Sequence, residues 1–195
     1  MKLVWKGKLT KDKGFPKANI PKDAKVFLGE ENSWHIYIIG ILIFILGIVL
    51  LKIKLNYFQG LRMKRIGYLI GLGLAVLFLV IHELIHGLSC PRDSTVNYYY
   101  SIYGITCYPL DPMNRNRYIF MAITPAIILG FIPLIIWIFM PVRFVMINSI
   151  LFTFSLGSLG GCTADLFNLL KALIKVPKES LIQASGSKVY WFSNS

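Results

Sequence analysis

The sequence is poor in charged residues. Asp, Glu, Lys and Arg make up 15% of its 195 residues, whereas about 25% is usual for soluble domains. Hydrophobic residues reach 55% and the mean hydropathy is +0.61. Several apolar runs are long enough to cross a bilayer. These features exclude an ordinary soluble enzyme and indicate an integral membrane protein of one domain, because the length leaves no room for a separate soluble catalytic domain.

Cysteine and acidic residues are also scarce. The three cysteines, Cys90, Cys107 and Cys162, are odd in number and show no C-x-x-C spacing. We therefore expect free thiols and no disulfide framework. Only 9 acidic residues oppose 21 basic ones, which gives a net charge of +12. Because the basic residues flank apolar runs, the expected partner is the lipid bilayer and not nucleic acid.

Four apolar runs predict an all-α membrane protein with about four transmembrane helices. The first run is short, so Lys52 and Lys54 are expected at the membrane interface. The fourth is longer than a bilayer requires and should be tilted or extend beyond it. The expected spans are 36–51, 66–89, 118–140 and 144–176.

Polar segments flank this membrane domain, which we expect over residues 36–176. Residues 1–35 form a Lys-rich segment, for which a short strand near residues 2–9 and simple attachment to the membrane surface are the alternatives. Residues 177–195 are expected to form a C-terminal tail. Of the 21 basic residues, 15 lie on the side shared by the two termini and the loop 90–117. The positive-inside rule then places both termini in the cytoplasm.

The second apolar run contains a His-Glu-x-x-His motif formed by His82, Glu83 and His86. Residues four apart lie on one face of a helix, so both imidazoles can reach one metal ion. Glu83 projects about 100° around the helix, where it can act as general base on a water that the metal activates. Polar residues with a purely structural role are the alternative. Ionisable side chains in hydrocarbon mark function by default, which favours a zinc site.

Two histidines do not complete a catalytic zinc site, which needs three protein ligands. The only other histidine, His35, precedes the first span. Asp165 is the sole acidic residue of the fourth span, at a depth similar to that of the motif. Gly157 and Gly161 precede it at four-residue spacing and would let a neighbouring helix approach closely. We therefore predict Asp165 as the third ligand; an ordinary interhelical hydrogen bond is the alternative.

Two further features near the motif carry open alternatives. Asn168 follows Asp165 by about one turn, where it could orient the aspartate, bind substrate or simply reach the membrane interface. The aromatic and β-branched stretch 95–108, with Gly104 as a turn point, predicts a β-hairpin. The hairpin could bind a substrate segment as an added strand, or its tyrosines could form an interfacial belt.

The residues His82-Glu83-Leu84-Ile85-His86-Gly87 and the later pair Asp165-Leu166 resemble a known family. This is the Putative zincin peptidase family of small bacterial membrane proteins, which is distantly similar to the site-2 intramembrane zinc metalloproteases. The resemblance implies zinc held by His82, His86 and Asp165, with Glu83 as the catalytic carboxylate. It also implies a bacterial cell membrane as the location. Site-2 proteases usually carry Asp-Gly where this chain has Asp165-Leu166, so we expect an unbroken fourth helix.

The function that these features favour is hydrolysis of peptide bonds in membrane or membrane-proximal substrates. A zinc-binding regulator without catalytic activity and a metal-ion carrier or sensor are the alternatives. Glu83 favours the peptidase, because it is unnecessary for holding a metal yet lies where a general base belongs. A carrier would show more polar residues along a path across the membrane, and the first and third spans contain almost none.

Overall fold

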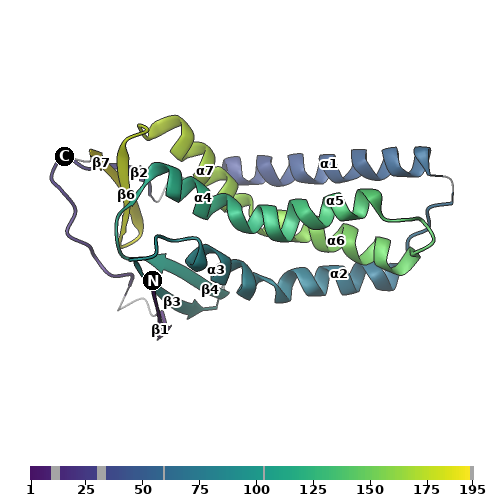
Figure 1. Ribbon diagram of the computed structural model, residues 1–195, viewed down its shortest axis with the longest axis horizontal. Coiled ribbons are helices and arrows are strands. Elements are labelled where there is room, and N and C mark those ends of the chain that lie inside the picture. The colour runs from purple at the N-terminus through teal and green to yellow at the C-terminus, as the bar shows by residue number, and fades with distance from the viewer. Residues whose placement is uncertain (10–13, 30–33, 59, 103, 194–195) are drawn as a thin grey trace. The chain divides into compact units, whose positions relative to one another are not determined.

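The computed structural model describes residues 1–9, 14–29, 34–58, 60–102 and 104–193 (Figure 1). Its contacts divide the chain into two compact units, and each is made of segments that are distant in sequence. Unit 1 contains Met1–Asn32, Val80–Thr124 and Asp165–Ser195, and unit 2 contains Ser33–Leu79 and Pro125–Ala164.

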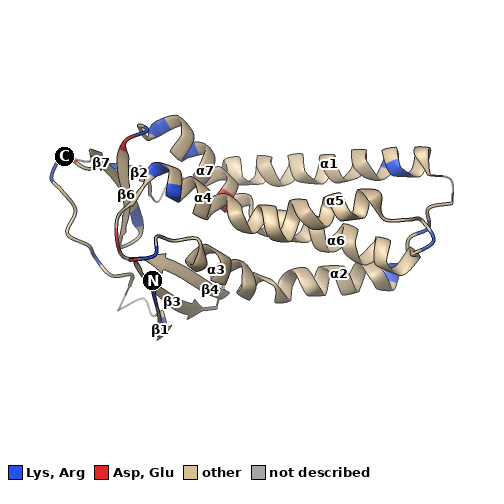
Figure 2. Ribbon diagram, viewed as in Figure 1, with Lys and Arg blue, Asp and Glu red and all other residues tan. Residues whose placement is uncertain are grey.

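Unit 2 is helical. Its elements are α1 (Trp34–Tyr57), α2 (Arg65–Leu77), the π-helical turn η1 (Ala126–Phe131), α5 (Ile132–Phe139) and α6 (Val145–Gly161). These helices consist almost wholly of uncharged residues, and Figure 2 shows Lys and Arg only towards the ends of α1 and α2.

Two helical stretches are long and apolar enough to cross a membrane. They are Trp34–Tyr57 and the continuous stretch Arg115–Phe139, and the helix continues through both prolines of that stretch, as the sequence suggested. Two bent pairs of helices, α2 with α3 (Leu79–Leu88) and α6 with α7 (Thr163–Lys175), raise the number to four if each pair is one span. The described residues therefore hold between two and four candidate spans.

The expectation of an unbroken fourth helix is wrong. α6 ends at Gly161 and α7 begins at Thr163, and the backbone N–H of Cys162 between them bonds the carbonyls of Ser158 and Leu159. Two glycines, Gly160 and Gly161, precede the break, and glycine is the weakest helix former after proline. The second span bends in a similar way at Phe78, where no glycine or proline marks the position.

Small residues let α2 and α6 approach closely. A Cβ built on Gly157 would lie 2.8 Å from the Cβ of Ala75 in α2, and one on Gly161 would lie 3.2 Å from a methyl group of Leu79, just beyond α2. Such contacts between small residues are typical of helices packed in membranes. The expected role of Gly157 and Gly161 is confirmed.

Lys54, which we expected at the membrane interface, is buried among the helices of unit 2. α1 continues to Tyr57, and Lys54 is only 3% exposed. Its ammonium group donates hydrogen bonds to the carbonyls of Trp137 and Met140 and to Oδ1 of Asn148. The first two acceptors are carbonyls at the end of α5; that of Trp137 also accepts from the N–H of Met140, and Lys54 adds a charged donor at this helix C-terminus.

Unit 1 contains two small sheets, so the all-α expectation is wrong for this part of the chain. The first sheet has the order β1-β3-β4, with β1 parallel to β3 and β3 antiparallel to β4. The second has the order β2-β7-β6-β5, and all of its pairs are antiparallel. The strands are β1 (Lys2–Lys8), β2 (Lys25–Leu28), β3 (Thr95–Ser101), β4 (Gly104–Pro109), β5 (Met113–Asn114), β6 (Ser180–Ser185) and β7 (Lys188–Ser193).

The hairpin expected over residues 95–108 is confirmed as β3 and β4. Gly104 has a φ of 117° at its turn, a conformation that residues with a side chain rarely adopt. The strand expected near residues 2–9 is present as β1, and both β6 and β7 lie within the segment expected to be a tail.

The helices of unit 1 pack against these sheets. They are α3, α4 (Arg115–Pro125) and α7. Arg115 is 8% exposed and donates hydrogen bonds to the carbonyls of Ala172 and Leu173 near the end of α7. The core consists of Phe27, Cys90, Val96, Tyr98, Met113, Tyr118, Ala172, Val176 and Ile182.

Candidate metal centre

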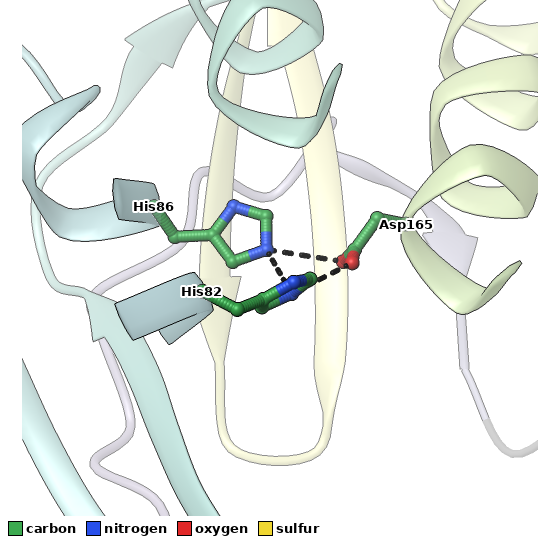
Figure 3. A group of neighbouring side chains, drawn as sticks. All are labelled: His82, His86 and Asp165. Carbon is green, nitrogen blue, oxygen red and sulfur yellow. Dashed lines mark hydrogen bonds and ion pairs between the residues drawn. The ribbon is translucent and has the colours of Figure 1, made fainter. Parts of the chain in front are cut away.

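Three of the predicted site residues meet in unit 1. Nε2 of His82 lies 3.1 Å from Oδ2 of Asp165, and Nε2 of His86 lies 3.4 Å from Oδ1 (Figure 3). The two Nε2 atoms are 3.0 Å apart. Four-residue spacing on α3 places the imidazoles on one face, and Asp165 reaches them from the first turn of α7.

The spacing of these donor atoms suits zinc. Bonds of about 2.0–2.1 Å in a tetrahedral site place ligand atoms about 3.3–3.4 Å apart. The three observed separations lie between 3.0 and 3.4 Å. Both histidines are 6% exposed, whereas the side chain of Asp165 is 22% exposed, so the group is largely enclosed but open on the side of the aspartate.

The hydrogen bonding of His86 also favours a cation. Its Nδ1 lies 2.9 Å from the carbonyl oxygen of Met121, which can only accept, so Nδ1 carries the hydrogen. In the neutral ring Nε2 then presents a bare lone pair to the carboxylate of Asp165. Metal-ligating histidines are usually oriented by such a bond through the other ring nitrogen. A cation between the acceptors relieves their repulsion.

Glu83 is held next to this group without joining it. Its Oε2 accepts a 2.7 Å hydrogen bond from the backbone N–H of Cys107 in β4. Glu83, His86, Asp165 and Asn168 line one cavity of about 300 Å³. The cavity is at the lower end of the usual size of ligand sites.

A family model described as Putative zincin peptidase matches residues 75–181, more than half of the chain. The chain belongs to this family. The matched stretch includes α3, the β3–β4 hairpin, α4 and Asp165. The family name implies a zinc-dependent peptidase. Neither a curated protein nor a solved structure matches the chain.

Two other polar residues from the sequence analysis, Asn168 and His35, lie outside the three-residue group. Asn168 lines the cavity one helical turn after Asp165, where both of its suggested polar roles stay open. His35 belongs to α1, in unit 2. Sequence reasoning missed the carbonyl of Met121 and the amide of Cys107, because any residue can supply a main-chain group and no residue type signals it.

Two thiols lie beside the cavity. Those of Cys90 and Cys107 share a hydrogen bond, which lowers the pKa of Cys90 and raises that of Cys107; burial raises the latter further. Both are free cysteines, as expected.

Tyr108 contacts two other segments of the chain at the cavity. Its hydroxyl group lies 3.1 Å from the carbonyl oxygen of Pro16 and 3.2 Å from that of Gly186. Burial raises the pKa of Tyr108 to about 12, so the phenol stays a hydrogen donor at neutral pH. One side chain thus joins β4, the N-terminal segment and the β6–β7 turn.

Proposed function

We propose that the protein is a membrane-embedded zinc metallopeptidase that cleaves membrane or membrane-proximal polypeptides. The observation that carries the proposal is the convergence of His82, His86 and Asp165 on one buried point beside Glu83. Family membership supports it, because the family name implies a zinc peptidase.

Each residue has a distinct task in this proposal. His82, His86 and Asp165 would hold a zinc ion, which would supply Lewis-acid chemistry to water and to the peptide carbonyl. Glu83 accepts the proton of the attacking water and returns it to the leaving amine. The bond from Cys107 fixes Oε2 of Glu83, so we assign proton transfer to Oε1.

The edge of β4 suits an extended substrate. In the described part of the chain β4 pairs only with β3. The N–H of Leu110 bonds the carbonyl of Thr95, and ladder bonds then fall on every second pair. The backbone groups of Ile105 and Cys107 therefore point away from β3. The N–H of Cys107 is taken by Glu83, which leaves its carbonyl and both groups of Ile105 for a strand that could be added. Such a strand would place its amides beside the residues that line the cavity.

The membrane placement that we propose has four spans, with each bent helix pair counted as one. The lipid bilayer and a polypeptide substrate are then the partners. The distribution of Lys and Arg favours cytoplasmic termini, in a bacterial cell membrane.

The variant Glu83→Gln tests the proposal. It keeps the shape of the side chain but removes its basicity, so zinc content should equal that of wild type. The purified protein would be reconstituted in liposomes with solubilised membrane polypeptides, and new termini counted by mass spectrometry. Their rate of appearance should fall by about 10²–10⁴-fold, the usual contribution of general acid–base catalysis.

The matched variant Asp165→Ala removes a ligand and should lose both zinc and activity. Equal rates for wild type and Glu83→Gln would contradict the peptidase and favour the regulator. Undiminished zinc in Asp165→Ala would contradict the assignment of the site.

A further inference from the structure

Three sulfur atoms gather beside the zinc ligands. Sγ of Cys90 lies 3.5 Å from Sδ of Met121, and the thiols of Cys90 and Cys107 are hydrogen-bonded to each other. The three residues come from different segments of unit 1: the residue pair after α3, the strand β4 and the helix α4. The three residues are not adjacent in sequence, so the cluster forms only when unit 1 is folded.

The cluster is enclosed but can be reached. Cys90 is 1% exposed, whereas Cys107 and Met121 line the cavity beside Glu83 and His86. An ion that enters this cavity therefore reaches two of the three residues. The guanidinium of Arg117 donates a 2.7 Å hydrogen bond to the carbonyl of Cys90 and can balance the negative charge of a thiolate.

We propose that Cys90, Cys107 and Met121 form a second metal site, which binds a soft monovalent cation of the Cu(I) class. Thiolates and thioethers prefer such ions, whereas a thioether adds little for zinc, which has a better matched set in two imidazoles and a carboxylate. Sulfur atoms bonded to one metal at about 2.3 Å in a trigonal arrangement lie about 4 Å apart. The observed separation of 3.5 Å between Cys90 and Met121 requires only a small adjustment.

This site does not depend on catalysis at the neighbouring centre. Its donors are sulfur atoms, and none of the three residues supplies a side chain to the group of His82, His86 and Asp165. The two sites touch through the main chain, because the carbonyl of Met121 accepts from His86 and the N–H of Cys107 donates to Glu83. Failure of the soft-metal site would leave the proposed peptidase intact, and the reverse also holds.

The test is a titration of the purified, reduced full-length protein with Cu(I), under anaerobic conditions and against a chromophoric Cu(I) chelator. Wild type should take up about one Cu(I) per chain. Cys90→Ser and Cys107→Ser should each weaken binding by more than about 10–100-fold, the loss caused by removing a group that merely orients a ligand. Met121→Leu should weaken it less, because both thiolates remain.

Matched variants make the result specific. Cys162→Ser removes the third cysteine, which lies in unit 2, and should bind Cu(I) like wild type. His86→Ala should lose zinc but keep the thiol-dependent Cu(I). Zinc content serves as the measure of folding for the cysteine variants, and the volume of Met121→Leu is nearly unchanged.

Several outcomes would overturn the proposal. Wild-type uptake in a Cys90→Ser, Cys107→Ser double variant would show that the copper lies elsewhere, as would an equal loss in Cys162→Ser. Reduced wild type with three titratable thiols and no Cu(I) uptake would show that no site exists. If the cysteine variants lose zinc, they can no longer be assumed to be folded, and X-ray absorption of copper-loaded wild type replaces them as the test. Copper with nitrogen ligands and no sulfur ligand would exclude the cluster as its site.

Discussion

Gly87 follows the second histidine of the motif and lies directly against Tyr98 of β3. A Cβ built on Gly87 would collide with the hydroxyl oxygen of Tyr98 and lie 2.8 Å from its ring carbon Cζ. Tyr98 is 5% exposed and belongs to the core, so it has little room to move. The absence of a side chain at Gly87 is therefore what allows α3 to lie against the hairpin.

Gly87→Ala should lower the free energy of unfolding by about 1–3 kcal/mol, the usual cost of overpacking. It should also reduce zinc content, because His86 is the preceding residue. Thermal unfolding in detergent and metal analysis measure the two effects. Gly73→Ala is the matched control: no atom lies within 4 Å of its Cβ, and alanine favours the helix. Wild-type stability of Gly87→Ala would contradict the close contact.

The side chains of the centre could be found from the sequence, because each carries a signal of its own. His82 and His86 share a helix face through local spacing, and Asp165 stands out as the only acid in its apolar run. The groups that orient them could not be found. Met121 and Cys107 act through the main chain, and their positions follow from how α4 and β4 pack.

At the scale of elements, the end of α1 is tied to α5 and α6 by one ammonium group. Lys54 satisfies two carbonyls at the end of α5 and the side chain of Asn148 in α6. Its ammonium also lies 4.5 Å from the ring centroid of Trp137, where cation–π attraction contributes. The ammonium group of Lys54 thus links α1 to the end of α5 and to α6.

Lys54→Met should destabilise the protein by about 1–3 kcal/mol, because the acceptors around it lose their charged donor. The exposed neighbour Lys52 provides the control, and Lys52→Met should unfold like wild type. Thermal unfolding in detergent compares the two variants. Equal melting temperatures would show that the bonds of Lys54 add nothing measurable.

The apolar runs predicted the helices well, since each run buries or presents one continuous surface and needs no distant partner. The strands behave differently. β1 pairs with β3 and β2 pairs with β7; nearly half of the chain lies between the first two partners and most of it between the second two. Local patterning cannot reveal such pairing, so short polar segments near both termini gave no clear sign of a sheet. The bend at Phe78 likewise has no marker in its residue types.

At the scale of the whole molecule, zinc would join α3 and α7, which are far apart in the chain. A chelator should therefore lower the melting temperature, and added zinc should restore it. With free zinc at a hundred times its Kd, binding contributes about 2.7 kcal/mol. The stabilisation should fade as the pH falls, because imidazole and carboxylate must be deprotonated to hold the metal.

His86→Ala should show a melting temperature that no longer responds to chelator or zinc. His35→Ala changes a histidine of unit 2 and should respond like wild type. The same response in His86→Ala as in wild type would place the stabilising metal elsewhere.

The proposed topology can be checked with cysteines introduced at exposed basic residues. Lys178 lies beyond α7, and Arg143 lies between α5 and α6. With cytoplasmic termini and four spans, a membrane-impermeant thiol reagent on intact cells should label Arg143→Cys but not Lys178→Cys. Wild type measures labelling of the native thiols, and the opposite pattern would invert the orientation.

Unit 1 is discontinuous, and this arrangement has a consequence for biosynthesis. The chain leaves the unit after Thr124 and returns to it only at Asp165. At a synthesis rate of about 5–20 residues per second, the roughly 80 positions from His86 to Asp165 take about 4–16 s to appear. During that interval a nascent chain carries both imidazoles without the carboxylate. The three side chains cannot be brought together until residue 165 has left the ribosome, so a chain that ends before it holds no complete ligand set.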